Sequence, residues 1–301
     1  MMVLIVGSVA YDTVITAVET RRGVLGGAAS YAAIAASYFS PVELVAVVGN
    51  DFAERDIEVF RKRGIDLRGL QLDRDRPSFF WKGEYSEDFS SRKTLELGLN
   101  AFEHFNPLLP EPLTVSRFVL LGNIGPSIQQ GVLGQLKGSA FVLTDTMDFW
   151  ITHNKEELLR VCKQTNLLVI NEKEAELLTF KKNVFLAGVD ILQLGCEAVI
   201  IKRGEYGSVL FHPQGQFILP AFPVIKVVDP TGAGDSYAGA LLGFLASIDK
   251  TDFSAIKQAM IYATIVASLT VQDFSCNALT SSNLMDIKGN YNHFMRLILA
   301  N

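Results

Sequence analysis

The sequence is poor in the residues that build metal clusters and disulfide frameworks. Its 301 residues include 3 cysteines and 4 histidines, and these are scattered without a CxxC, HxxxH or HExxH pattern. Neither structural zinc nor a disulfide-stapled domain is therefore expected. The segment Met1 to Gly7 also lacks the basic lead-in and cleavage site of a signal peptide, which predicts a cytoplasmic protein.

A surplus of positive charge and long apolar runs are missing as well. The chain has 27 Lys+Arg against 32 Asp+Glu and a net charge of -5, whereas a general nucleic-acid binder needs a basic surplus to displace counterions. The apolar runs Phe118 to Leu121 and Ile261 to Val271 stop short of the roughly 18 to 20 positions that cross a bilayer. With 49% hydrophobic residues, the chain is too apolar for disorder. We expect a soluble protein with a large core, and neither nucleic acid nor membrane as a partner.

Short apolar runs alternate with helix-like stretches over most of the chain. Strands with apolar residues on both faces are typical of a parallel sheet that is covered by helices on both sides. This alternation predicts an α/β fold, a three-layer α/β/α sandwich with a mainly parallel central sheet. The expected strands are Val3–Val6, Val42–Val48, Phe118–Leu121, Phe141–Thr144, Leu167–Ile170 and Ala198–Ile201. The expected helices are Ala28–Phe39, Asp51–Arg63, Asn154–Gln164, Glu172–Phe180, Val184–Leu194, Ser236–Ser247 and Phe253–Val271.

A polar and aromatic window at 71–106 departs from this rhythm. Leu95, Leu97 and Leu99 alternate with other residues, which is the period of a half-exposed strand. We interpret the window, with a short segment at about 12–24, as an antiparallel excursion from the main sheet. It is either an ordinary surface hairpin or a small β lid over a site. No linker or repeat divides the chain, so a single domain over 1–301 is expected.

The segment Asp229-Pro230-Thr231-Gly232-Ala233-Gly234-Asp235 carries the clearest chemical signal. Its Gly-Ala-Gly run offers closely spaced backbone N–H groups at the start of an apolar helix, whose N-terminus carries partial positive charge. That arrangement predicts an anion hole. It is not a Walker A loop, because no Gly-Lys-Ser/Thr follows, and it is not a GxGxxG fingerprint, because Tyr237 takes the place of the third glycine.

Asp235 is the informative residue of this segment. A carboxylate beside an anion site repels its ligand, which makes sense if the carboxylate accepts a proton from a hydroxyl that attacks a bound phosphoryl group. A helix N-cap is its alternative role. N-capping alone does not explain the glycines that precede it.

The residues at this point resemble a known family. The DPTGAGD segment resembles the C-terminal signature of ribokinase-like (PfkB-type) carbohydrate kinases, and Gly26-Gly27, at the start of a helix of small residues, resembles the N-terminal one. The resemblance spans nearly the whole chain. Further matches follow in the family's order: Gly7–Asp12, Val47–Asp51, Asn171–Glu174 and Lys202–Gly207.

The resemblance implies a phosphotransferase that uses ATP and Mg²⁺. Asp235 is then the base, and the backbone of Gly232, Ala233 and Gly234 stabilises the transferring phosphoryl group. On the substrate side, the resemblance implies that Gly26 and Gly27 let the substrate approach the backbone and that Asp12 holds its hydroxyls. Asp12 is alternatively a turn residue. Tyr31 stands where the family often has a sugar-binding Asn, so we expect a changed substrate pocket there.

The resemblance also implies the nucleotide and metal sites. Asn171 and Glu174 match the family's Asn-x-x-Glu motif, which organises Mg²⁺ and phosphate, although the same spacing is that of a helix capping box. Asp229 matches a position that binds a monovalent cation such as K⁺ in some members. The expected ATP-binding residues are Lys202, Gly204, Gly207 and Thr231.

The leading expectation is an ATP-dependent carbohydrate kinase that phosphorylates a hydroxyl of a sugar or related small polyol. A nucleoside kinase of the same fold is the alternative within this class. A non-catalytic sensor of a sugar or nucleotide is the alternative from another class. A homodimer through the lid and a monomer are equally compatible with the sequence.

Overall fold

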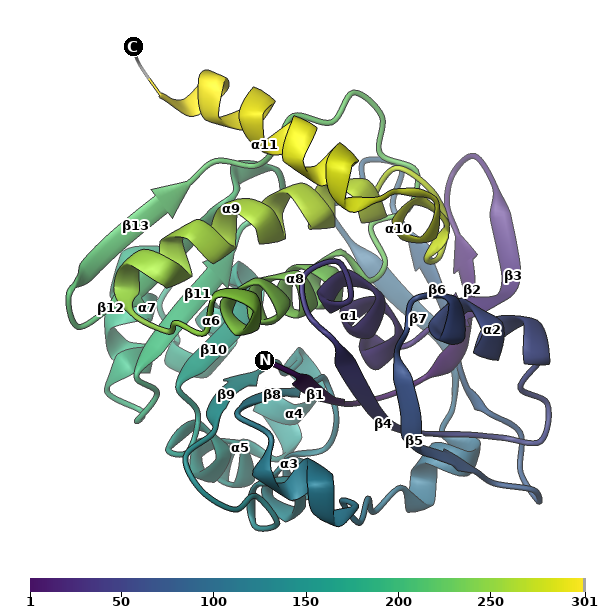
Figure 1. The fold of residues 1–301 in the computed structure, drawn as a ribbon. Helices are drawn as coiled ribbons and strands as arrows, with labels where there is room; N and C mark the ends of the chain where they lie inside the picture. Colours follow the sequence, from purple (N-terminus) through teal and green to yellow (C-terminus); the bar gives the residue numbers. More distant parts are fainter. Residues whose placement is uncertain (300–301) are drawn as a thin grey trace.

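The computed structural model describes residues 1–299, and a nine-stranded sheet runs through its centre (Figure 1). The strand β12 runs antiparallel to its two neighbours, β11 and β13, and all other neighbouring strands pair in parallel. In order across the sheet they are β13 (Gly215–Leu219), β12 (Ser208–His212), β11 (Ala198–Lys202), β10 (Leu167–Asn171), β9 (Phe141–Thr144), β8 (Phe118–Leu121), β1 (Val3–Val6), β4 (Val42–Val48) and β5 (Asp66–Leu72).

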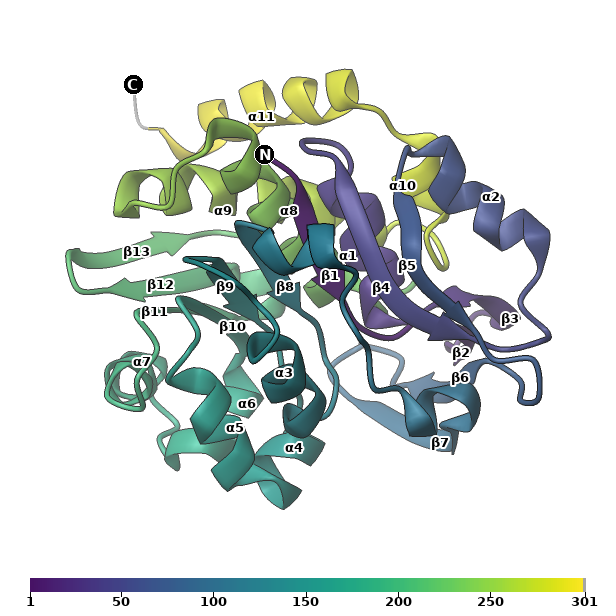
Figure 2. The ribbon, with the colours of Figure 1, turned by 60° about the horizontal axis from the view of Figure 1, so that its bottom comes forward.

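Helices cover both faces of this sheet, so the three-layer sandwich expected from the sequence is confirmed (Figures 1 and 2). One face carries α1 (Ala28–Ala36), α2 (Glu54–Lys62), α8 (Ala233–Ile248), α9 (Phe253–Thr270), α10 (Asn277–Ser281) and α11 (Leu284–Ile298). The other face carries α3 (Pro126–Leu133), α4 (Asp148–His153), α5 (Lys155–Cys162), α6 (Glu172–Thr179) and α7 (Val184–Leu192).

The core strands coincide with the apolar runs because their side chains are buried on both faces. All residues of β1 and β4 are buried. The sequence analysis did not identify β5, β12 or β13. The strand β12 is buried except at His212, whereas β5 and β13 lie at the two ends of the sheet and are largely exposed or half-buried. An edge strand of this kind needs no continuous apolar run, so it leaves no such signal in the sequence.

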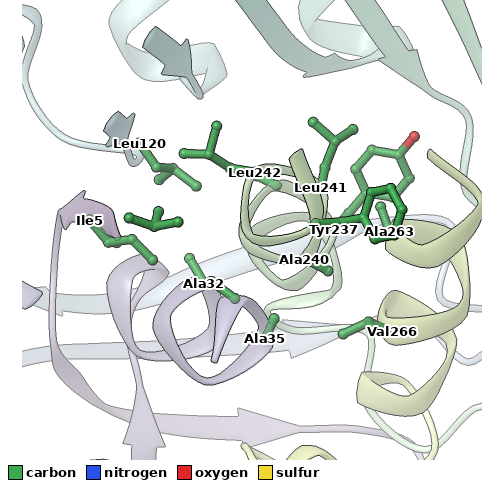
Figure 3. Packing of buried hydrophobic residues seen from close by; sticks show 14 of the residues in the cluster. Ile5, Ala32, Ala35, Leu120, Tyr237, Ala240, Leu241, Leu242, Ala263 and Val266 are labelled. Carbon is green, nitrogen blue, oxygen red and sulfur yellow. The ribbon is translucent and has the colours of Figure 1, made fainter. Parts of the chain in front are cut away.

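Small residues allow α1 and α8 to pack backbone against backbone. A Cβ on Gly239 would lie 2.1 Å from the carbonyl oxygen of Ala32, and one on Gly243 would lie 2.7 Å from that of Ala36. Figure 3 shows Ala32 and Ala240 where the two helices face each other. Because α1 starts after Gly27 and α8 starts after Gly232, this packing fixes two glycine-rich helix starts relative to each other.

A second sheet of four strands projects from the main body (Figure 2). Its strand order is β3 (Thr20–Gly26), β2 (Ala10–Ile15), β6 (Phe79–Tyr85) and β7 (Arg92–Gly98). The hairpins β2–β3 and β6–β7 are antiparallel, as the sequence suggested, but β2 and β6 join them in parallel. Residues 71–72 belong to β5 of the main sheet and not to this excursion.

Helix α9 is longer than the apolar run that marks it in the sequence. It spans 18 residues with a mean hydropathy of 1.2, so by length and composition alone it could cross a membrane. In the fold, 61% of it is buried, and it packs against α8 and α11. A core helix satisfies the same criteria, so this feature alone does not indicate a membrane span.

Candidate active site

The DPTGAGD segment leads into α8, and its last three residues begin the first turn of this helix. Gly232 is the N-cap with φ 77°, and the helix begins at Ala233, three residues before the expected start. Asp235 therefore lies within the first turn and is not the N-cap. Because the first N–H groups of a helix have no partner within it, Gly234 and Asp235 offer donors to an anion at the positive end of the helix, and the N–H of Ala233 beside them makes a long contact of 3.3 Å with the carbonyl oxygen of Pro230.

Lys202 lies directly against this turn. A Cβ on Gly234 would stand 2.8 Å from the Lys202 Nζ, and the same Nζ lies 3.9 Å from Oδ1 of Asp145. The Lys202 side chain is only 17% exposed, and the charge of Glu174 also acts on it. The end of β11 thus places a half-buried ammonium group beside the anion hole, where Asp145 partly balances its charge.

Asp235 faces charges of both signs. Burial raises the pKa of its carboxyl group to about 6, and repulsion from Asp145 acts in the same direction. The positive charges of Lys202 and Arg92 oppose the rise. A carboxylate whose pKa lies near 6 is ionised at neutral pH and still able to accept a proton, which suits a general base.

Asp12 occupies the same region from the lid side. It is 4% exposed, and a Cβ on Gly26 would collide with its carboxylate, 2.0 Å from Oδ2. Burial, followed by repulsion from Asp229 and Asp235, raises the pKa of Asp12 to about 8. The structure therefore brings Asp12, Gly26 and Asp235 together, although more than 200 positions separate the first two from the third in the sequence.

Tyr31 lies beneath the anion hole. It is 1% exposed, and a Cβ on Gly232 would stand 2.4 Å from its ring atoms. Its buried hydroxyl has no hydrogen-bond partner within residues 1–299. An unpartnered buried hydroxyl is costly. A hydroxyl-bearing ligand reaching this position would relieve that cost.

Asn171 and Glu174 form the capping box that their spacing indicates. The Asn171 side chain accepts from the Glu174 N–H, and Glu174 Oε2 accepts from the Asn171 N–H, both at 2.8 Å. Burial, with repulsion from Asp145, raises the pKa of Glu174 to about 7. No cluster of three or more His, Cys, Asp or Glu side chains within residues 1–299 could hold a metal ion. The Asn171 amide and the Glu174 carboxylate therefore fit Mg²⁺ that is held through water and nucleotide phosphates, as that ion prefers. A cation there would also reduce the repulsion between Glu174 and Asp145.

Asp229 is fully buried below the anion hole. Its Oδ1 accepts from the Thr231 N–H at 2.9 Å, while its Oδ2 has no partner in the described part of the chain. A buried, half-satisfied carboxylate fits a cation ligand.

Glycines shape the turn between β11 and β12. Gly204 has φ 56° and Gly207 has φ 86°, a region that favours glycine. A Cβ on Gly207 would also lie 2.0 Å from the carbonyl oxygen of Leu219. Beside this turn, Arg203 donates to Glu172 at 3.3 Å, so its charge already has a partner.

The lid sheet closes over the DPTGAGD segment. The hydroxyls of Tyr85 and Thr231 lie 2.9 Å apart, and Tyr85 packs with Val14 and Phe274 in a buried cluster. Arg92 lies on the neighbouring strand, opposite Tyr85. Sequence reasoning missed Arg92 because it belongs to no motif, and only the pairing of β6 with β7 reveals its position.

Comparison with known proteins agrees with this architecture. The sequence pattern of the pfkB family carbohydrate kinases matches residues 135–283. A cytidine kinase of Thermococcus kodakarensis is 30% identical, over 82% of this chain and 88% of that protein. A nucleoside kinase of Methanocaldococcus jannaschii is 26% identical, over 86% of this chain and 83% of that protein.

Solved structures share the fold. The M. jannaschii nucleoside kinase, an archaeal member of the ribokinase family, superposes with a TM-score of 0.77 at 21% identity and covers 97% of this chain and 98% of its own. The aminoimidazole riboside kinase of Salmonella enterica, solved with aminoimidazole riboside and an ATP analogue, gives 0.76 at 21% identity, with 97% and 100% covered.

The fold and the site define a sugar or nucleoside kinase of the ribokinase fold, an ATP-dependent class of phosphotransferases. The chain belongs to the PfkB family of carbohydrate kinases.

Proposed function

We propose that this enzyme transfers the γ-phosphoryl group of ATP to a ribose hydroxyl of a nucleoside. The observation that carries the reaction is the position of Asp235 in the first turn of α8, between the anion hole and the charges of Lys202 and Arg92. The names of the relatives support the acceptor class, since they include a cytidine kinase and nucleoside kinases. The free sugar or polyol expected first from the sequence is the second candidate, because Asp12 can hold the hydroxyls of either.

In the proposed mechanism the acceptor hydroxyl lies between Asp12 and Asp235. Asp12 and the Tyr31 hydroxyl bind the other ribose hydroxyls. Asp235 takes the proton of the attacking hydroxyl as its oxygen bonds to the γ-phosphorus and the bond to the β-phosphate oxygen breaks. The backbone N–H groups of Gly232, Ala233 and Gly234 and the ammonium of Lys202 then stabilise the negative charge on the transferring group.

The same proposal assigns the nucleotide and ion sites. Gly204, Gly207, Thr231 and Lys202 bind ATP, and Glu174 with Asn171 orients Mg²⁺ through water. Bound Mg²⁺ supplies neutralisation of phosphate charge. Asp229 takes part in a site for a monovalent cation such as K⁺, supported by its unpartnered Oδ2. The cytoplasmic location stays a prediction.

A substrate screen tests this function. ATP turnover is measured against a panel of nucleosides, sugars and polyols, with Asp235→Asn as the comparison. We expect a nucleoside to give the highest kcat/KM. The Asn variant should lose on the order of 10³-fold or more in kcat, because general-base assistance and the negative charge beside the hydroxyl both disappear.

The two parts of the proposal fail separately. A free sugar preferred over every nucleoside would overturn the acceptor class and leave the mechanism in place. An Asp235→Asn variant with wild-type turnover would overturn the mechanism. Affinity for ADP, measured by calorimetry, should stay nearly unchanged in this variant and shows that the fold is intact.

A further inference from the structure

The inner face of the lid carries an arginine, Arg92, that forms no salt bridge within residues 1–299. Arg92 begins β7 and pairs with Tyr85 of β6. Paired residues share a face of a sheet, so Arg92 is on the side from which Tyr85 reaches Thr231 at 2.9 Å. Arg92 is therefore on the side of the lid that faces the anion hole.

An aromatic arrangement holds Arg92 in place. Its guanidinium lies 5.3 Å from the centre of the Trp81 ring, close enough for a cation–π interaction. The Trp81 Nε1 donates to Thr94 Oγ1 at 3.1 Å. A Cβ on Gly83, which lies on the same strand as Trp81, would stand 2.0 Å from the Trp81 ring, so the glycine leaves room for this ring.

The charge of Arg92 opposes the rise that burial causes in the pKa of its strand neighbour Tyr85, and it also acts on the carboxylates of the site. No salt bridge with a carboxylate involves Arg92 within residues 1–299, and its side chain remains exposed. Yet it opposes the burial-driven rise in the pKa of both Asp12 and Asp235. Its positive charge thus faces the same two carboxylates between which the acceptor hydroxyl is placed.

We propose that Arg92 contacts the transferring phosphoryl group when the lid is closed, as the counterpart of Lys202 on the opposite side. The inference rests on the function proposed above. During phosphoryl transfer, negative charge spreads over three equatorial oxygens. Lys202 and the first turn of α8 face these oxygens from the main sheet, and Arg92 is the cation that the lid adds. A planar guanidinium can donate to two phosphate oxygens at once.

This assignment also links closure to chemistry. With the lid open, Arg92 leaves the site, so the charge on the phosphoryl group is fully neutralised only when Tyr85 meets Thr231. An enzyme arranged in this way transfers phosphate to an enclosed acceptor in preference to water.

The test compares Arg92→Gln and Arg92→Lys with Lys93→Gln. Lys93 is the next residue on β7, is exposed and pairs with Glu84 on the other face of the sheet. We expect Arg92→Gln to lower kcat on the order of 100-fold, with ADP affinity changed by less than about threefold. Arg92→Lys should recover part of the loss because it restores the charge without the planar donors. Lys93→Gln should remain within about twofold of wild type.

Several outcomes would overturn the proposal. One is an Arg92→Gln variant that turns over no more slowly than Lys93→Gln. Another is an equal loss of turnover and ADP affinity, because that marks a structural role. If a free sugar is the acceptor, the acceptor class fails and the comparison proceeds with that sugar. If no compound in the panel is phosphorylated, the test is the affinity for ADP with aluminium fluoride, which mimics the transferring group. Arg92→Gln must then lower the affinity for ADP with aluminium fluoride about tenfold more than it lowers the affinity for ADP alone.

Discussion

Gly232 is constrained by its backbone and by its neighbour. Its φ of 77° lies in the left-handed region, and a Cβ would stand 2.4 Å from ring atoms of Tyr31. Gly64 provides a matched control, since it has φ +67° and nothing within 4 Å of a Cβ.

We expect Gly64→Ala to lower the free energy of unfolding by about 1 kcal/mol, because an alanine in the left-handed region is strained. Gly232→Ala should cost about 2 kcal/mol more, because the ring of Tyr31 must move, and it should also lower kcat by displacing the first turn of α8. Urea unfolding and steady-state kinetics of both variants check this. Equal losses of stability would show that the Tyr31 contact is unimportant.

Asp12 makes stability depend on pH. Burial raises its pKa from 3.8 to about 8, so between these pH values the folded protein holds a proton that the unfolded chain releases. The contribution of this proton to the free energy of unfolding is therefore complete below pH 4 and is lost as the pH rises towards 8.

We expect Asp12→Asn to be more stable than wild type at pH 8 by about 1 to 3 kcal/mol, and the difference should shrink towards pH 5. The variant should also lose affinity for the acceptor. Urea midpoints at pH 5, 6.5 and 8 measure the effect, with Asp75→Asn, in an exposed loop, as the control. An unchanged pH dependence in Asp12→Asn would contradict this account.

The capping box of α6 separates two roles that sequence reasoning could not distinguish. Asn171 caps α6 at the candidate Mg²⁺ site, and Asn183 caps α7 by accepting from the N–H groups of Phe185 and Leu186. Replacing either asparagine with alanine should lower the free energy of unfolding by about 1 kcal/mol, because a helix cap is lost. Only Asn171→Ala should increase the Mg²⁺ concentration needed for half-maximal turnover. If both variants showed the same Mg²⁺ requirement, Asn171 would be a helix cap alone.

A hydrogen bond between the hydroxyls of Tyr85 and Thr231 joins the lid to the DPTGAGD segment. Removing it with Tyr85→Phe leaves the buried ring and deletes the 2.9 Å contact with Thr231. We expect the acceptor KM to rise about fivefold, the equivalent of one neutral hydrogen bond, and ATP hydrolysis without acceptor to increase as water enters. Tyr291→Phe on α11, outside the site, is the control. A Tyr85→Phe variant that matches it in both measurements would show that this contact does not hold the lid.

Most of the buried strands of the main sheet could be predicted from the sequence, although β12 (Ser208–His212), which is buried except at His212, was not. The strand β4 and the DPTGAGD segment have local signals, a continuous apolar run and a dense glycine motif. The edge strand β13 lacks such a signal because only one of its five residues is buried. The meeting of Asp12, Asp145 and Asp235 depends on how distant segments pack, and no local pattern encodes it.

Across the whole molecule, the negative balance of -5 leaves phosphate binding to local charges. The candidate site itself is rich in carboxylates, with Asp145 and Glu174 beside Lys202. The first turn of α8, Lys202 and Arg92 must therefore outweigh the repulsion, and a bound cation would add to them. This crowding explains why burial and mutual repulsion raise several carboxyl pKa values in one place.

The outer rim of the lid suggests how two molecules could associate. The strand β7 is the edge of the four-stranded sheet, so its outer N–H and C=O groups are free for pairing with another strand. Leu95 within β7 and Leu99 directly after it are 41% and 43% exposed. Exposed apolar residues along an unpaired edge favour association with a second copy of the chain.

We expect a homodimer through β7, measured as a concentration-dependent mass by light scattering after size exclusion. Leu95→Lys should shift the protein to monomer, because a charged side chain on an edge strand opposes pairing. Leu186→Lys, on α7 at 57% exposure, should leave the dimer intact. If the lids support each other in the dimer, the Leu95→Lys monomer should show a higher acceptor KM with ADP affinity unchanged. A wild-type protein that stays monomeric at about 100 μM, where even weak interfaces associate, would exclude this arrangement.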